Sequence, residues 1–112
     1  MFKLIVSDTV VAPVKGSMTD ANGRKVDFSF SLVARRMPAD ELNAMHRDGD
    51  SKTVNQVLTE NVTGWRDVVA EDGTPAEFSQ AALGQMLNIL GMSATCYTAY
   101  LEACGAKGKE KN

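Results

Sequence analysis

The sequence has few of the side chains that build metal centres and disulfide frameworks. It contains one histidine, His46, and two cysteines, Cys96 and Cys104. The cysteines are eight residues apart, which on a helix places them about 12 Å from each other, too far for an internal disulfide. A zinc site would also lack ligands, since neither cysteine belongs to a CxxC pair. We therefore expect two reduced thiols and no metal-binding residues.

Motifs for phosphate binding, calcium binding and nucleophilic catalysis are also missing. The nine glycines form neither GxxxxGK(S/T) nor GxGxxG, the two common phosphate-binding patterns. Residues 48–59 begin like a calcium loop, but Lys52 occupies the fifth position and Thr59 replaces the bidentate glutamate. No Gly-x-Ser-x-Gly elbow presents a serine to His46. The sequence therefore predicts no enzymatic activity, no catalytic or cofactor-binding residues and no cofactor.

Long apolar runs and a strong charge of either sign are absent as well. No apolar run is long enough to span a membrane, and the first residues lack a long apolar signal segment. The formal net charge of −2 gives no general attraction to nucleic-acid phosphates or to anionic membranes. We therefore expect a cytoplasmic protein whose partners include neither nucleic acid nor a membrane.

What is present is the composition of one ordinary globular domain. Of the 112 residues, 44% are hydrophobic and 23% are charged, which is typical of a folded chain of this size. Residues 1–105 are predicted to form a single domain. Residues 106–112 are polar and rich in lysine, and we expect them to be a disordered tail.

The first third of the chain predicts a long antiparallel β-hairpin over residues 2–36. Asn22 and Gly23 form a strong short hairpin signal, because both residue types tolerate positive φ. Before this turn, Pro13 favours an edge position or a bulge. After it, apolar and polar residues alternate with the period of a half-buried strand, and the apolar ones are Val26, Phe28, Phe30 and Leu32. Phe28 and Phe30 should therefore be buried on one face.

Two helices are predicted in the middle of the chain. Pro38 opens the first, where acidic residues suit the helix dipole, and Leu42 and Met45 should face inward. The second is capped by Asp50 or Ser51 and ends at residues 63–64. Its apolar positions follow helical spacing and are Val54, Val57 and Leu58.

Two more helices follow, which completes an α+β fold of one N-terminal long antiparallel β-hairpin and about four short α-helices. Ser79 is the predicted N-cap of the third helix, and Gly91 is its predicted stop. The apolar stripe of this helix contains Leu83, Met86, Leu87 and Leu90. Ser93 is expected to cap the fourth helix and Gly105 to end it.

Trp65, the single tryptophan, lies at a predicted break between elements. The simpler interpretation is a core residue that fills the gap between the hairpin and the helices. The functional interpretation is a partner-facing anchor, since tryptophan is enriched at binding hot spots. The candidate protein-binding residues are therefore Trp65 and three members of the helical stripe, Leu83, Met86 and Leu87.

Several segments follow one another in a characteristic order along the chain. They are the Gly23 hairpin, residues 33–37 at the end of its second strand, the acidic helix start at 38–42, Gly64 with Trp65, the acidic turn at Gly73, Phe78 with Ser79, and residues 97–103. This order and spacing resembles that of the tail assembly chaperones of long-tailed bacteriophages. The resemblance covers nearly the whole chain.

The resemblance implies a small α+β protein without catalytic activity, made in the cytoplasm of the infected or lysogenic bacterial host. Such proteins bind the long tape-measure protein, keep it soluble and help recruit tail-tube subunits, and they are absent from the mature virion. A tape-measure protein exposes apolar helical stripes before the tube encloses it, and many weakly bound copies of a small protein would cover them. Self-association along this client is a further expectation.

Two alternatives stay open. One is another small phage tail structural or adaptor protein that is retained in the virion, and its presence in purified particles would distinguish it. The other is a regulatory or nucleic-acid-binding module outside phage biology. The net charge of −2 opposes the second alternative.

Overall fold

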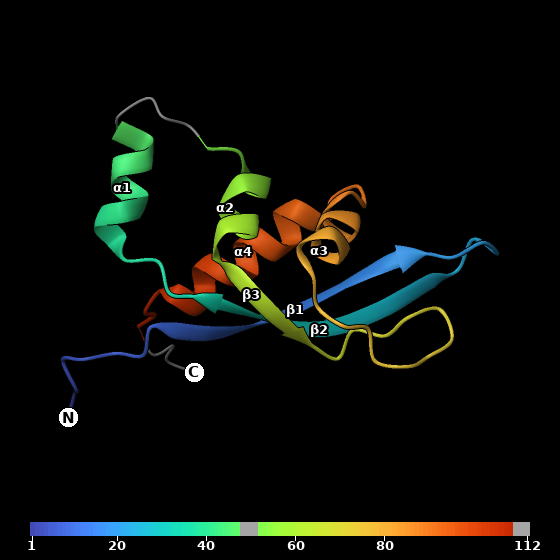
Figure 1. Cartoon of the computed structure of the whole chain (residues 1–112), viewed down its shortest axis with the longest axis horizontal. Helices are drawn as coiled ribbons and strands as arrows, with labels where there is room; N and C mark the ends of the chain where they lie inside the picture. Colours follow the sequence, from blue (N-terminus) through green and yellow to red (C-terminus); the bar gives the residue numbers. More distant parts are fainter. Residues whose placement is uncertain (48–51, 109–112) are drawn as a thin grey trace.

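The computed structural model describes residues 1–47 and 52–108, which form a three-stranded antiparallel sheet and four helices. The strands are β1 (Thr9–Thr19), β2 (Lys25–Arg35) and β3 (Val62–Arg66). The helices are α1 (Ala39–Arg47), α2 (Val54–Asn61), α3 (Gln80–Leu87) and α4 (Met92–Cys104) (Figure 1). The predicted α+β class is confirmed. The third strand was not predicted.

The hairpin is formed by β1 and β2, in a register that runs from Thr9 opposite Arg35 to Thr19 opposite Lys25. Its turn is held by the Asp20 carboxylate, which accepts hydrogen bonds from the backbone N–H of Asn22 at 2.8 Å and of Arg24 at 2.9 Å. Gly23 has φ of 78°, as the Asn-Gly signal predicts. The predicted start at residue 2 is wrong, because β1 begins at Thr9.

Pro13 lies in β1, which is an edge strand of the sheet. The backbone N–H of Asp20 donates to the Arg24 carbonyl across the hairpin. The N–H groups of the even-numbered residues of β1 therefore point toward β2, and those of the odd-numbered residues point away from it. The nitrogen of Pro13 therefore points away from β2, where its missing N–H costs no ladder bond. The predicted edge position is confirmed.

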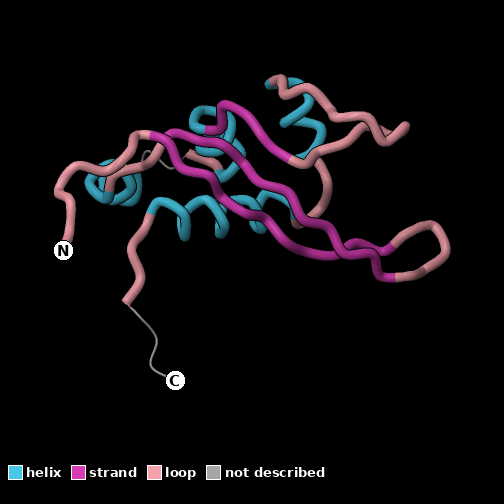
Figure 2. Tube along the Cα trace, turned by 90° about the horizontal axis from the view of Figure 1, so that it is seen from below, coloured by secondary structure: helices cyan, strands magenta, loops and turns pink. Residues whose placement is uncertain are grey.

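The core lies between one face of the sheet and helices α2, α3 and α4, and α4 runs beside β1 (Figure 1). Phe30 is buried there, as predicted, but Phe28 is only half-buried and Val26 is 49% exposed. The far end of the hairpin extends beyond the helices (Figure 2). The side chains of β2 therefore become more exposed toward the hairpin turn. The other buried apolar residues of the strands and helices are Val10, Ala12, Val14, Leu32, Ala34, Val57, Leu58, Val62, Leu83, Leu87, Met92, Cys96 and Tyr100.

The helix boundaries correct several sequence-based predictions. Thr53 is the N-cap of α2 and forms a reciprocal capping box with Gln56, whereas the predicted caps at positions 50 and 51 lie outside the described residues. The capping box satisfies two backbone donors at once, which favours the later start. The segment at 62–66, expected to be a helix end, is strand β3.

Ser79 caps α3 as predicted, with its hydroxyl 3.0 Å from the N–H of Ala82. The helix ends at Leu87 rather than continuing to residue 90, and Gly91, with φ of 86°, is the N-cap of α4. Ser93 is therefore not a cap, and its hydroxyl bonds to the Leu87 carbonyl and the Asn55 side chain. Gly105 ends α4 as predicted. Most of the predicted tail at 106–112 lies outside the described residues.

Candidate protein-contact surface

Trp65 lies in β3, directly opposite Leu32 of β2, on the face of the sheet that carries the core. Its indole N–H donates to the carbonyl of Ala76 at 2.9 Å, and its ring meets Phe78 edge-on with centroids 5.2 Å apart. These contacts fasten the 67–78 loop to the sheet. The side chain is only half-buried, so a structural role and a partner contact remain compatible.

The three stripe residues separate into two groups. Leu83 is fully buried and Leu87 nearly so, which places both among the core side chains and away from any partner. Met86 is half-buried and packs against the edge of the core. Of the predicted contact residues, only Trp65 and Met86 therefore present area at the surface.

The turn between α3 and α4 exposes two large apolar side chains, of which Leu90 was predicted to be buried. Leu90 was expected to continue the buried stripe, but its side chain is completely exposed (101%), and Ile89 is 39% exposed. The turn is tight, with Ile89 N–H bonded to Met86 and Met92 N–H bonded to Ile89, and this geometry directs both side chains away from the core. We call Met86, Ile89 and Leu90 the corner surface.

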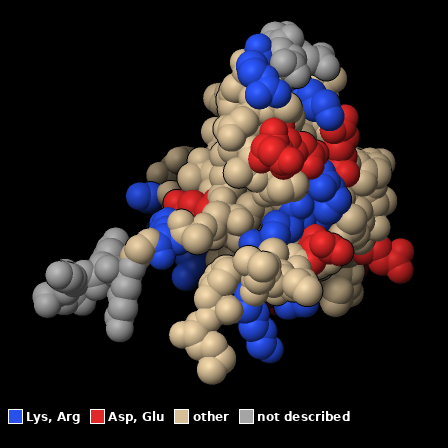
Figure 3. All heavy atoms as spheres, turned by 90° about the vertical axis from the view of Figure 1, so that its left-hand side faces the viewer, with Lys and Arg blue, Asp and Glu red and all other residues tan. Residues whose placement is uncertain are grey.

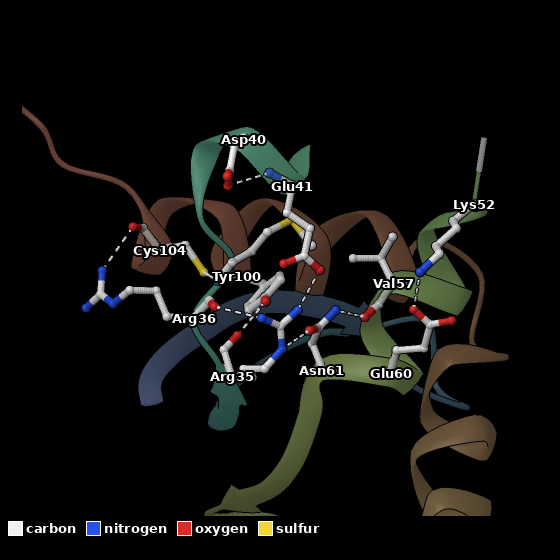
Figure 4. A network of polar contacts seen from close by, with 11 residues as sticks. Arg35, Arg36, Asp40, Glu41, Lys52, Val57, Glu60, Asn61, Tyr100 and Cys104 are labelled. Carbon is white, nitrogen blue, oxygen red and sulfur yellow. Dashed lines mark hydrogen bonds and ion pairs between the residues drawn. The ribbon is translucent and has the colours of Figure 1, made fainter. Parts of the chain in front are cut away.

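A polar network at the other end of the sheet joins four elements (Figure 4). The Arg35 guanidinium donates to Glu41 of α1 at 2.6 Å and to Asn61 of α2 at 3.0 Å. The Arg35 carbonyl accepts a hydrogen bond from the Tyr100 hydroxyl of α4 at 2.5 Å. The hydrogen bond with Glu41 raises the pKa of Arg35, which strengthens a permanent positive charge. Glu41, Asn61 and Tyr100 each bond to Arg35, so the network holds α1, α2 and α4 to β2.

Two buried titratable groups are kept neutral by their surroundings. Desolvation raises the pKa of the Cys96 thiol to about 11, and desolvation followed by the nearby Cys104 raises the pKa of the Tyr100 hydroxyl. A thiol that stays protonated at neutral pH is a poor nucleophile and a poor metal ligand. Both cysteines are free, as predicted. Cys96 therefore acts as an apolar core residue.

Charges of both signs are mixed over the face that carries α1 and the N-terminal segment (Figure 3). Such a face has no broad field of one sign that would attract a polyanion. Within residues 1–47 and 52–108, no group of three or more histidine, cysteine or acidic side chains is placed to hold a metal ion. None of the helices in those ranges is long and apolar enough to span a membrane.

With this geometry established, comparison with protein-family models, with curated proteins and with solved structures finds no match.

Sequence reasoning missed three exposed apolar groups. They are the corner residues Ile89 and Leu90, the hairpin residues Met18 and Val26, and a run near the N-terminus that contains Phe2, Leu4, Ile5 and Val6. Periodicity assigned Leu90 and Val26 to buried faces, because it cannot show where an element ends or where its neighbours stop. The N-terminal run was placed inside the hairpin because residues 4–14 are rich in β-branched side chains.

Proposed function

We propose that this protein is a tail assembly chaperone of a long-tailed bacteriophage, which binds the tape-measure protein and helps recruit tail-tube subunits during tail morphogenesis. It acts in the cytoplasm of the bacterial host and is absent from the mature virion. The proposal is supported by the order of segments along the sequence and by an α+β fold that presents apolar contact surface. It includes no catalytic step.

The observation that carries the proposal is the corner surface. Leu90 gives nothing to the core of this chain and is completely exposed. It follows Ile89, whose backbone N–H is bonded to the Met86 carbonyl. Grouped apolar side chains at a surface are typical of a protein interaction site. An amphipathic helix presents apolar residues at spacings that suit such a patch, and a tape-measure protein would supply many of them.

We expect the substitutions Ile89→Ser and Leu90→Ser to weaken capture of the tape-measure protein. Burying one leucine at an interface contributes about 2 kcal/mol to the binding free energy, so its loss should raise Kd roughly thirtyfold. Leu90 is completely exposed, so Leu90→Ser should melt at the temperature of the unchanged protein, whereas Ile89 is 39% exposed and its variant is compared per folded molecule. The measurement is co-purification of the tape-measure protein with tagged chaperone after co-expression in bacteria.

Val69→Ser is the control, since Val69 is an apolar residue on the 67–78 loop that is 61% exposed, between the values for Ile89 and Leu90. It should leave capture unchanged. Equal capture by the corner variants and the unchanged protein would place the client surface elsewhere. Failure of the unchanged protein to capture any tape-measure protein would refute the chaperone function itself.

The alternative function is that of a small tail structural or adaptor protein retained in the virion. Mass spectrometry of purified particles separates the two, because a chaperone is released before the tail is complete. Stoichiometric amounts of this chain in intact particles would favour the adaptor and exclude the chaperone.

A further inference from the structure

The segment before β1 is strongly apolar and lies outside the core. Leu4 and Ile5 are each 90% exposed, and Phe2 is 80% exposed. The chain is anchored only from Ser7 onward, where Arg36 donates to the Ser7 carbonyl at 2.8 Å and to the Asp8 carbonyl at 2.6 Å. Exposed apolar residues in such a run mark a surface that another protein covers.

A second unsatisfied surface lies at the opposite end of the molecule, on the projecting hairpin (Figures 1 and 2). Strand β3 ends at Arg66, opposite Ser31, so within the described chain the edge of β2 from Lys25 to Phe30 has no neighbouring strand. The register with β1 directs the N–H and C=O groups of Lys25, Asp27 and Ser29 toward this open edge.

The side chains beside the open edge are apolar on the inner face. Val26 is 49% exposed, Met18 opposite it is 44% exposed, and Phe28 is half-buried. They line a shallow cavity of about 250 Å³ together with Thr19, Asp20 and Asp27. The Phe28 ring lies over Gly16 of β1 and stacks with Phe30 at 6.0 Å. The inner face is therefore preformed and apolar.

We propose that the N-terminal segment of one molecule, residues 2–6, adds as an antiparallel strand to the open edge of β2 in a second copy of this chain. Strand addition would supply the backbone hydrogen bonds that the edge lacks. It would also cover Phe2 and Leu4 of one partner and the apolar inner face beside the open edge of the other in one contact.

One antiparallel register satisfies both faces of the added strand. If Lys3 lies opposite Asp27, then Leu4 lies opposite Val26 and Phe2 lies opposite Phe28. Residues that oppose each other share a face of the sheet, so the two apolar pairs fall on the inner face. Lys3 and Asp27 then form an opposite-charge pair on the outer face.

The segment cannot reach this edge in its own molecule. Asp27 lies opposite Ser17, eight residues beyond Thr9 in β1, which is about 27 Å along the strand. Lys3 precedes Thr9 by six residues, which span at most about 21 Å when fully extended. Residues 2–6 at this edge would therefore come from another copy.

The other long edge of the sheet, formed by β1, is a poorer site for strand addition. Pro13 sits midway along β1 with its nitrogen facing outward, so an added strand would lose a hydrogen bond at that point. The contact on β2 joins two different surfaces, which makes it heterologous. Each added copy leaves one segment and one edge free, and association continues until a ring closes or a filament grows.

The test is sedimentation of the purified full chain over a range of concentrations, and it requires no client. We expect the mean mass to rise above that of the monomer with concentration. Leu4→Lys should return the chain to the monomer, with its melting temperature unchanged because Leu4 is exposed. The matched control Val69→Lys should associate as the unchanged chain does.

Charge reversal tests the register. Lys3→Glu and Asp27→Lys should each weaken association about fivefold, and the double variant should restore it. A monomer at every concentration would overturn the proposal, as would association that survives Leu4→Lys. Single charge reversals without effect, or a double variant no stronger than either single one, would overturn the register. Because no tape-measure protein is present, these outcomes are independent of the chaperone proposal.

Discussion

At the residue scale, the buried polar groups of this protein have defined partners. The Asn61 side chain donates to the Val57 carbonyl at 2.7 Å and accepts from Arg35 at 3.0 Å, so both ends of its amide are used. Within the described chain, no buried side-chain nitrogen or oxygen lacks a hydrogen-bond partner. This pattern is typical of a structural network, since an unpaired buried polar group costs about 1–3 kcal/mol.

Phe30 tests how far the core extends along the hairpin. Phe30 is buried and Phe28 is half-buried, although both lie on the same face of β2. We expect Phe30→Ala to reduce the free energy of unfolding by about 3–5 kcal/mol, and Phe28→Ala to reduce it by less. Urea denaturation of both variants measures the difference. Equal losses would mean that the core reaches the hairpin tip.

Cys96 should make stability fall at alkaline pH. Burial raises the pKa of its thiol from 9.0 to about 11, so between these values the unfolded chain loses a proton that the folded chain keeps. The contribution of the protonated Cys96 thiol to the free energy of unfolding is therefore fully present well below pH 9, and it is lost as the pH rises toward 11. The loss between pH 9 and 10 should be about 1 kcal/mol.

The measurement is the midpoint of urea denaturation at pH 8, 9 and 10, with Cys96→Ala as the control. The variant is less stable at every pH, since it loses buried volume, but its decline with pH should be shallower. Parallel declines in the two proteins would show that Cys96 does not titrate differently on folding. Tyr100, whose pKa is also raised by burial, adds its own decline as the pH approaches and passes 10, and this decline is common to both proteins.

At the element scale, the corner between α3 and α4 depends on one backbone conformation. Gly91 has φ of 86°, a region that L side chains rarely adopt. Gly91 is the N-cap of α4 and closes the turn that follows α3, so its conformation helps to determine where Ile89 and Leu90 lie. The sequence indicated a left-handed glycine here. It could not indicate that α3 would stop at Leu87, because the apolar spacing continues to Leu90.

Two glycines near this corner should respond in opposite ways to alanine. Gly91→Ala should destabilise the protein by about 1–2 kcal/mol, since it forces a side chain into the left-handed region. Gly84→Ala lies within α3, where an added Cβ meets no atom within 4 Å, and it should stabilise the helix by up to about 1 kcal/mol. Thermal unfolding of both variants decides this, and a shift of the same sign in both would contradict the assignment.

At the scale of the whole molecule, the two proposed contact surfaces belong to different parts of the fold. The corner surface lies at the junction of two helices, whereas the strand-addition contact uses the hairpin edge and the N-terminal segment. A molecule can therefore bind a client with one surface while it joins its neighbours through the other. That arrangement would let many copies cover a long chain, since linked weak contacts give a high effective concentration.

The sequence by itself determined the local features of this protein. The hairpin turn at Gly23, the edge position of Pro13, the Ser79 cap and the end of α4 at Gly105 all follow from preferences of a few neighbouring residues. Such preferences act over short distances and can be read from short stretches of sequence. The same is true of the α+β class and of the two free thiols.

Only the tertiary structure decided which apolar residues are buried. Leu83 and Leu90 share one helical pattern in the sequence, yet the first is in the core and the second is fully exposed. Val26 and Leu32 lie on the same face of β2, yet only Leu32 belongs to the core beneath the helices, while Val26 is exposed. Trp65 lies in a strand because residues 62–66 pair with the edge of β2. Burial depends on where distant elements end and meet, and periodicity within one element does not contain that information.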